Sequence, residues 1–225
     1  LFAKEITALA QKNKKITLLS GDIGNRMFDD FKEIAPNRFF NCGIAEANMM
    51  SVASGMALSG QRPVIYTITP FTTTRCLEQI KIGAAYHNAN VVIIGTGSGL
   101  SYSELGATHH SLEDIAIIRS IPNIRILAPC DPQELKVHLR ESLTIDGPTY
   151  IRIGKKGEPI LFKDPSMLGI GKSNLIKEGT DFLILVIGPI INEAISAAIE
   201  LEKIGIEVAV ANLGSIRPLD DLFLK

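Results

Sequence analysis

Apolar residues in the first two thirds of the chain form short continuous runs that alternate with stretches of helical spacing. Apolar strands separated by helices are typical of a parallel sheet covered on both faces. We therefore predict an α/β fold, a three-layer parallel sheet with helices on both faces. The predicted strands are residues 16–20, 38–42, 63–68, 91–95, 124–129 and 149–153, and the predicted helices are 1–15, 26–34, 44–59, 73–87, 112–120 and 132–143.

The pattern changes after residue 153. Residues 154–179 contain Gly, Pro, Lys and Ser without periodicity, which is typical of a connection between domains. A second unit follows, with a strand at 182–188, a helix at 190–203 and a strand at 206–211. One such unit cannot bury both faces of a sheet, so we expect an incomplete second α/β domain. The predicted organisation is a first domain at 1–157, a linker at 158–178 and a second domain at 179–225.

Two helix starts carry capping signals. Asp131-Pro132-Gln133-Glu134 places an N-cap, a first-turn proline and an N3 glutamate in order. The segment from Ser111 to Asp114 is a similar box with Asp in place of the usual Glu, so we expect Asp114 to be a helix-surface or capping residue.

The composition is that of an ordinary globular protein, with 46% hydrophobic residues, 21% charged residues and a net charge of −1. Near-neutral charge without a basic run argues against a nucleic-acid or anionic-membrane partner. No apolar run approaches the roughly 18 residues of a membrane span, and no leader is evident. The three widely spaced cysteines favour a reducing, cytoplasmic location over a disulfide framework or a zinc site. The four histidines lack metal-ligand spacing, so we expect no metal site.

Glu46 is the only formally charged residue between Arg38 and Arg62. One interpretation is a first-turn glutamate of helix 44–59 that favours the helix dipole and caps near Asn41 or Gly43. However, the helix has no clear polar face, and a helix that is apolar all round is buried. A buried first-turn carboxylate is a candidate for a proton-handling role.

Glycines recur in residues 91–101, directly after a predicted strand. The spacing is G-x-G-x-G and no helix follows at once, which disfavours a dinucleotide-binding fingerprint. A tight loop at the carboxyl end of a strand, where open α/β sheets bind ligands, fits better. His109 and His110 follow this loop, and either a polar pair at a helix start or one functional histidine is consistent with their position.

Basic residues gather where strand 149–153 ends. Arg152, Lys155 and Lys156 lie around Gly154. They are either solvated linker charges or an anion site for a phosphorylated substrate.

Taken together and in this order, three segments resemble the transketolase family of thiamine diphosphate enzymes. Residues 38–71, RFFNCGIAEANMMSVASGMALSGQRPVIYTITPF, are similar to the pyrimidine-binding domain around the family's glutamate. Residues 106–134 are similar to its G-P/A-T-H segment and the R-x-x-P-N and A-P-x-D run that follows. Residues 208–220, VAVANLGSIRPLD, resemble the start of its third domain, so the resemblance covers almost the whole chain.

The resemblance implies a thiamine diphosphate-dependent transferase that moves a two-carbon ketol unit between sugar phosphates. The glutamate matching Glu46 hydrogen-bonds a pyrimidine nitrogen of the cofactor and helps to activate it, and His109 matches a histidine near the reacting sugar. The catalytic candidates are therefore Glu46 and His109. The implied cofactor contacts are Glu46, Phe71 and Ile44, and the implied substrate contacts are His109, Lys155 and Arg75.

The sequence departs from the family pattern at Leu105, where many transketolases have an aspartate that contacts sugar hydroxyls. This departure argues against a housekeeping pentose-phosphate role. The stacking region around Phe71 holds one aromatic residue where relatives often hold two. A synthase related to deoxyxylulose-phosphate synthase is the alternative enzyme. A catalytically silent assembly module is the alternative from another class.

The family's G-D-G…N motif, which binds the diphosphate and a magnesium or calcium ion, is not matched by residues 21–25, GDIGN. We therefore expect a diphosphate-binding N-terminal domain or subunit as a partner and little activity from this chain alone. The chain is either a fragment or one subunit of a split enzyme. A homodimer of this domain or a heterotetramer is the expected assembly.

Overall fold

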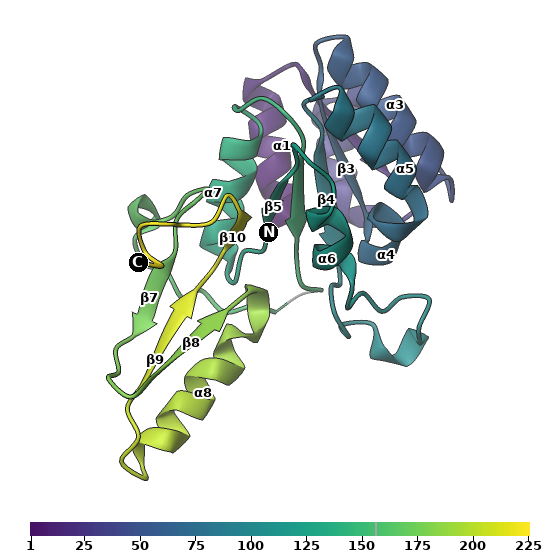
Figure 1. Ribbon diagram of the computed structural model, residues 1–225. Helices are drawn as coiled ribbons and strands as arrows, with labels where there is room; N and C mark the ends of the chain where they lie inside the picture. The colour runs from purple at the N-terminus through teal and green to yellow at the C-terminus, as the bar shows by residue number, and fades with distance from the viewer. Residues whose placement is uncertain (156) are drawn as a thin grey trace.

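A seven-stranded sheet forms the centre of the larger part of the molecule (Figure 1). The computed structural model describes residues 1–155 and 157–225. The strand order is β10-β5-β6-β4-β3-β1-β2, and every pairing is parallel except that of β10 with β5. The strands are β1 Ile16–Ser20, β2 Phe39–Asn41, β3 Arg62–Ile68, β4 Val92–Thr96, β5 Arg125–Leu127, β6 Thr149–Arg152 and β10 Ser215–Arg217.

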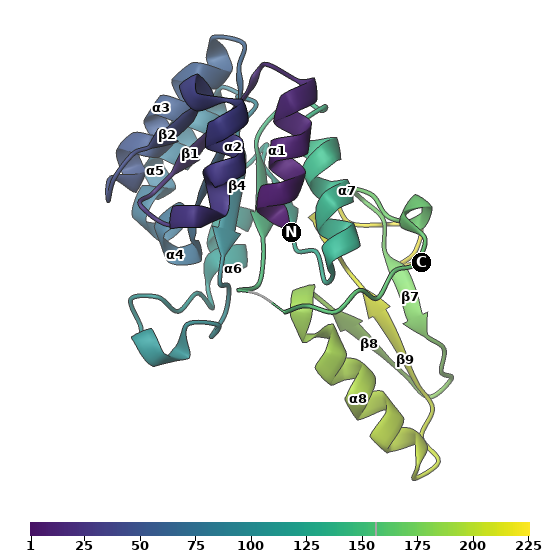
Figure 2. The same ribbon diagram turned by 180° about the vertical axis from the view of Figure 1, so that it is seen from behind.

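Helices cover both faces of this sheet (Figures 1 and 2). Successive strand residues point to opposite faces, so Leu18 and Val64 join one core while Leu19 and Ile65 join the other. The first core packs against α1 Phe2–Lys12, α2 Asp29–Ile34 and α7 Pro132–Ser142, and the second against α3 Glu46–Leu58, α5 Leu77–Gln79, the π-helix η4 Ile80–Tyr86 and α6 Asp114–Arg119. The predicted three-layer α/β class is confirmed.

The strand order reverses direction at β1. From β1 the chain crosses to β2 on one side, and β3 then pairs with β1 on the other side. Such a reversal opens a crevice outside the carboxyl ends of the two strands involved, where open α/β sheets bind ligands. The crevice expected here lies beyond Ser20 of β1 and Ile68 of β3.

The predicted helix 73–87 is not continuous. The segment instead forms α4 Thr69–Thr72, the 3-10 turn η3 Thr74–Cys76, α5 and η4. The hydroxyls of Thr72, Thr73 and Thr74 donate to main-chain carbonyls three or four residues earlier. Such local bonds offer the backbone an alternative to a regular helix.

The expectation that α3 is buried all round was wrong. Its inner face carries Met49, Met50 and Ala53, which are fully buried. The outer face exposes Val52 by 39% and Leu58 by 58%. A helix in the outer layer of a three-layer fold rests on the sheet with one face only, which explains the difference.

The smaller part of the molecule contains a three-stranded sheet of order β7-β9-β8, packed against helix α8 Ile191–Glu202 (Figure 1). Its strands are β7 Asn174–Lys177, β8 Phe182–Val186 and β9 Val208–Asn212. Two features differ from the expected organisation. Strand β7 lies inside the predicted linker and pairs antiparallel with β9, and β10 returns to the edge of the first sheet beside β5.

The first turn of α7 connects the two parts. Asp131 caps this helix as predicted, because its Oδ1 accepts a bond from the Glu134 N–H at 2.7 Å. Its Oδ2 accepts from the main chain of Leu161 and Phe162. The buried Glu134 carboxylate accepts from the Cys130 N–H and from Asn212 Nδ2, each at 2.8 Å. Two acidic side chains of one helix turn thus hold segments from both parts.

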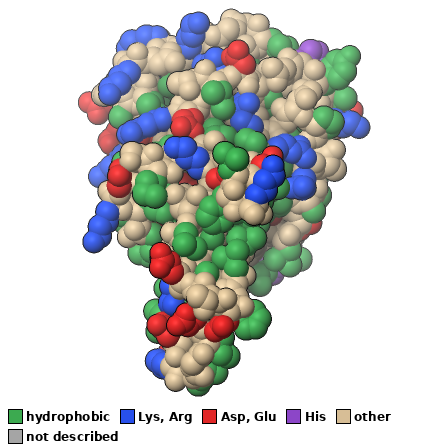
Figure 3. All heavy atoms as spheres, turned by 60° about the vertical axis from the view of Figure 1, so that its left-hand side comes forward, with side chains coloured by type: hydrophobic (Ala, Val, Ile, Leu, Met, Phe, Trp, Pro, Cys, Tyr) green, Lys and Arg blue, Asp and Glu red, His purple; other side chains and the backbone are tan. Residues whose placement is uncertain are grey.

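The remaining short helices are 3-10 turns: η1 Asn25–Phe28, η2 Pro36–Arg38, η5 Ser103–Leu105, η6 Pro165–Met167 and η7 Gly188–Ile190. No helix in the described part of the chain is long and apolar enough to cross a bilayer. On the face drawn in Figure 3, Lys and Arg side chains are scattered among acidic ones and do not form one continuous basic patch.

Two buried titratable residues of α7, Glu134 and His138, predict a pH dependence of the stability that single substitutions reveal. Burial raises the pKa of Glu134 from 4.5 to about 7 and lowers the pKa of His138 from 6.5 to about 4, and the two side chains are 3.9 Å apart. Folded Glu134 therefore keeps its proton up to about pH 7, and its contribution to stability falls as the pH rises from 4.5 to 7. Folded His138 remains neutral, and its contribution rises between pH 4 and 6.5.

The two slopes, each at most about 1.4 kcal/mol per pH unit, oppose each other in the intact protein. In Glu134→Gln only the His138 slope remains, so the unfolding free energy should increase from pH 4 to 6.5. In His138→Leu only the Glu134 slope remains, so the unfolding free energy should decrease from pH 4.5 to 7. Urea unfolding across this pH range measures both slopes. Identical pH profiles for the two variants would contradict the prediction.

Candidate active site

Gly21 directly follows β1, at the point where the strand order reverses. A Cβ atom at this position would lie 3.1 Å from Cβ and Oγ1 of Thr67 and 3.3 Å from Cγ of Glu46. These contacts are tight for a side-chain carbon, so a residue without a side chain leaves room for both groups. Thr67 comes from β3 and Glu46 from the start of α3, so three separate segments meet here.

Glu46 is the first residue of α3, and its side chain is only 2% exposed. Its Oε2 accepts a hydrogen bond from Arg75 Nη1 at 2.8 Å. Its Oε1 accepts none from the residues that the structure describes. The carboxylate is therefore paired with an arginine and does not cap the helix, whose N-cap Ala45 makes no side-chain bond.

Glu46 also influences Cys76. Burial, with a smaller contribution from the Glu46 carboxylate, raises the pKa of the Cys76 thiol to about 12. This cysteine is therefore a protonated, buried side chain at neutral pH and not a nucleophile.

Arg75 links Glu46 to two further predicted residues. Its guanidinium carbon lies 3.9 Å from the centre of the Phe71 ring, so the cation covers one face of that ring. The Phe71 ring also contacts the His109 ring edge-on, with ring centres 5.2 Å apart. Glu46, Arg75, Phe71 and His109 thus form one continuous row of contacts.

Tyr102 extends this row and was not predicted from the sequence. Its ring centre lies 6.1 Å from that of His109 and 4.3 Å from Lys155 Nζ. Gly97, with φ of +69°, makes room for Tyr102, because a Cβ there would overlap the Tyr102 ring. The signal available in the sequence was an aromatic residue in the glycine-rich loop after a strand.

Lys155 lies beside this row and is exposed. Its Nζ lies 3.1 Å from Oε1 of Glu104, so both the acid and the Tyr102 ring hold the ammonium group. Of the two histidines, Nδ1 of His109 lies 2.9 Å from Thr108 Oγ1, whereas His110 contacts the main-chain oxygen of Ser103. His109 is therefore the one that faces the row.

One of the other candidates, Ile44, lies apart from this row. Ile44 is 80% exposed and stands outside the hydrophobic cores. Lys156 lies outside the described residues. The glycine-rich loop is not followed by a helix at its glycines, since α6 begins only at Asp114, so the phosphate cradle of a dinucleotide site is not formed.

The expectation that Asp114 is a helix-surface or capping residue was wrong. The N-cap of α6 is Glu113, and Asp114 is 1% exposed. Its Oδ2 accepts from Tyr150 Oη at 2.7 Å and from Arg152 Nε at 2.8 Å. Burial and this carboxylate raise the pKa of Tyr150 well above its usual value, so the phenol stays protonated. Arg152 is thus held by Asp114 and not solvated as a linker charge.

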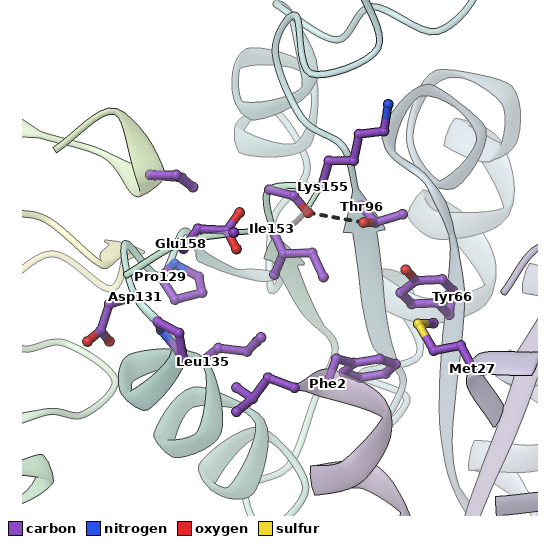
Figure 4. A pocket seen from close by; sticks show the side chains of 15 residues that line it. Phe2, Met27, Tyr66, Thr96, Pro129, Asp131, Leu135, Ile153, Lys155 and Glu158 are labelled. Carbon is purple, nitrogen blue, oxygen red and sulfur yellow. Dashed lines mark hydrogen bonds between the residues drawn. The ribbon is translucent and has the colours of Figure 1, made fainter. Parts of the chain in front are cut away.

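Two cavities lie near the same edge of the sheet. One cavity, of about 770 Å³, lies between the start of α8 on one side and the loop Ser98–Ser101 and Arg152 on the other. The other, of about 420 Å³, lies on the side of α1 and α7 between Phe2, Tyr66 and Leu135, and Figure 4 shows that the Lys155 side chain points away from it. Neither is lined by Glu46, Phe71 or His109, so this chain does not by itself enclose the row.

No group of three or more His, Cys, Asp or Glu side chains that could hold a metal ion occurs within residues 1–155 and 157–225.

The fold and the site together are those of an α/β protein with a buried glutamate where the strand order of its sheet reverses. Residues 1–158 match the family model described as transketolase, pyrimidine binding domain, and residues 171–225 match that of the transketolase C-terminal domain. The chain belongs to the transketolase family.

Named relatives agree with this assignment. An apulose-4-phosphate transketolase subunit from Phocaeicola vulgatus is 34% identical over 221 residues, covering 97% of this chain and 71% of that protein. A protein of the same name from Actinobacillus succinogenes is 37% identical over 82% of this chain, which there covers only 60% of the relative's length. A 6-deoxy-6-sulfo-D-fructose transketolase subunit from Clostridium sp. is 34% identical over 94% of this chain and 66% of that protein.

Solved structures show the same fold. A structure described as "Split gene transketolase, inactive beta4 tetramer" has a TM-score of 0.88 and 34% identity, covering 99% of this chain and 73% of that chain. A transketolase from Pichia stipitis, at 18% identity, has a TM-score of 0.85 and supports the fold alone. The match covers 97% of this chain but only 35% of that protein.

The Glu46–Arg75 pair predicts an asymmetric effect on stability. Arg75→Met leaves the 2% exposed Glu46 carboxylate without its cation, so the unfolding free energy should fall by about 1–3 kcal/mol, less than for a fully buried pair because the Arg75 side chain is 42% exposed. Adding Glu46→Gln removes the unpaired charge and should restore most of that loss. Urea unfolding of both single variants and the double variant tests this, and additive losses would contradict it.

Proposed function

We propose that the chain is the pyrimidine-binding part of a thiamine diphosphate-dependent, transketolase-like transferase that moves a two-carbon ketol unit between sugar phosphates. The observation that carries the proposal is the buried Glu46 carboxylate at the switch point, with one oxygen free of hydrogen bonds from the described residues. The family assignment supports the same reaction class.

The residues present fit the aminopyrimidine ring of the cofactor. The free Oε1 of Glu46 can accept a hydrogen bond from a protonated ring nitrogen, and Phe71 offers an aromatic ring close by. Arg75 covers one face of Phe71 at 3.9 Å, so a stacked ring either displaces the guanidinium or uses the opposite face. When bound, thiamine diphosphate supplies the nucleophilic carbon and the electron sink for breaking the carbon–carbon bond.

The protein's own residues then have distinct roles. Glu46 holds or shares a proton at its carboxylate, and burial of this side chain, which is 2% exposed, strengthens the interaction. His109, packed against Phe71 and Tyr102, presents its imidazole to the hydroxyls or carbonyl of the sugar. Lys155, with its exposed ammonium group, binds the phosphate of the substrate, and Arg75 and Ile44 are retained as substrate and cofactor contacts respectively.

A partner completes the site. We propose that a diphosphate-binding domain or subunit holds the diphosphate together with magnesium or calcium and that this chain alone is inactive. The relatives named as transketolase subunits and the neighbour described as an inactive β4 tetramer support this arrangement. A homodimer of this domain or a heterotetramer is supported by exposed apolar side chains on α3 and η4. These side chains are Val52, Leu58, Ile82 and Tyr86.

The location proposed is the cytoplasm, supported by three cysteines that are all free thiols. The sugar is less constrained. Leu105 stands on η5 with 49% of its surface exposed, where it offers no carboxylate to sugar hydroxyls. Relatives of similar identity carry names that refer to apulose 4-phosphate and to 6-deoxy-6-sulfo-D-fructose, which supports a sugar outside the central pentose-phosphate route.

The first test is reconstitution. The chain, the diphosphate-binding subunit, thiamine diphosphate and magnesium should together give ketol transfer, and Glu46→Ala should lower kcat by at least about 100-fold because proton transfer is lost. The exposed helix residue Glu78 provides a matched control, and Glu78→Ala should remain within about twofold of the parent. Normal turnover by the Glu46→Ala enzyme would contradict the proposed role.

A second test separates the enzyme classes. A deoxyxylulose-phosphate synthase from Desulfitobacterium hafniense is 32% identical over 223 residues, so this reaction is the second candidate. Ketose phosphates as donors should give a chain-lengthened sugar, whereas pyruvate as donor should give no product. Product formation from pyruvate with release of carbon dioxide would favour the synthase, and no cofactor-dependent product from either donor would favour an assembly module.

A further inference from the structure

Thr67 is a buried threonine whose hydroxyl lacks a hydrogen-bond partner. The residue is 0% exposed, and its Oγ1 has no partner among the residues that the structure describes. An unpaired buried hydroxyl is costly, and in native structures such a group calls for an explanation. It lies next to the proposed site, because both Thr67 and Glu46 lie within 3.3 Å of the point that a Gly21 Cβ would take.

The hydroxyls of the neighbouring threonines all have hydrogen-bond partners. Thr69 donates to the Thr96 carbonyl at 3.0 Å, and Thr73 donates to the Thr69 carbonyl at 2.7 Å. Thr72 and Thr74 also bond to main-chain oxygens of the same segment. Within 67–74, where every residue is described, the hydroxyl of Thr67 alone remains unpaired, although main-chain acceptors are plentiful.

Thr67 lies on the same face of the sheet as Glu46. Along β3, Ile65 packs into the core on the α3 side of the sheet, and residues two apart on a strand share a face. Thr67 is therefore on the same side as Glu46, one position before the carboxyl end of the strand. Because Gly21 has no side chain, no protein atom occupies the point beside both side chains that a Cβ would take.

We infer that Thr67 is a second polar contact for the aminopyrimidine ring, and that its hydroxyl pairs with a nitrogen of that ring once Glu46 holds the other polar edge. A hydroxyl both donates and accepts, so it suits a ring that carries nitrogen acceptors and an amino donor. The cofactor would supply the partner that this hydroxyl does not find among the described residues. This inference rests on the proposed function and adds a binding residue to it.

The test uses the complete assembly of this chain with its diphosphate-binding subunit, with thiamine diphosphate and magnesium as the probe. Thr67→Val keeps the shape and removes the hydroxyl, and it should raise the Kd of thiamine diphosphate about 3- to 10-fold. Thr67→Ser restores the hydroxyl and should return the Kd to within about twofold of the parent. The matched control is Thr73→Val, which removes a hydroxyl that already has its partner and should leave the Kd unchanged.

Thermal unfolding provides a readout independent of activity. Without cofactor, Thr67→Val should be at least as stable as the parent, because no bond is lost, while Thr73→Val should have a lower Tm. With cofactor, the rise in Tm should be smaller for Thr67→Val than for the parent.

The possible failures are distinguishable. If the parent assembly binds thiamine diphosphate and Thr67→Val binds it equally well, the inference is overturned and the proposed function stands. A Thr67→Val protein that loses stability without cofactor while keeping the parent Kd would assign the hydroxyl a structural role and also overturn the inference. If the parent assembly shows no binding, the proposed function fails and the inference fails with it.

Discussion

Burying the Glu46 carboxylate costs free energy unless a partner compensates for the lost water, and Arg75 provides that partner at 2.8 Å. The need for this pair explains much of the surrounding structure. Arg75 reaches Glu46 because the segment after β3 breaks into short turns and does not continue as a regular helix. The same break places the Phe71 ring under the Arg75 guanidinium. The Phe71 ring also contacts His109 edge-on.

The sheet determines where this charge is held. Strand order reverses at β1, so the segments that follow β1 and β3 pack on opposite faces of the sheet, and α3 begins on the same face as the segment after β3. The topology of the sheet therefore sets the position of Glu46, Gly21 leaves space for its side chain, and Arg75 balances its charge. Because these contributions come from separate segments, the row is sensitive to the packing of the whole α3 face, including the core of Met49, Ile65 and Ile80.

The sequence predicts most of the fold because continuous apolar strands and amphipathic helices are local patterns. Strand 16–20 was predicted to the residue. The short strands β7 and β10 were missed because they are stabilised by pairing with β9 and β5, which no local pattern encodes. At the site, Glu46 was conspicuous as an isolated charge, and the family resemblance indicated Phe71 and His109. Thr67 and Tyr102 were not found, because their importance depends on neighbours distant in sequence.

Strand β10 has a consequence for how the chain folds. It follows the second unit in sequence but covers the edge of β5, which otherwise presents unpaired main-chain groups at the end of the sheet. The larger part therefore cannot be separated cleanly at the connection after residue 157, since a nascent or proteolysed chain lacking β10 carries an open edge. Self-association through that edge competes with folding until the second part has been synthesised, and the two parts are coupled during folding as well as in the finished structure.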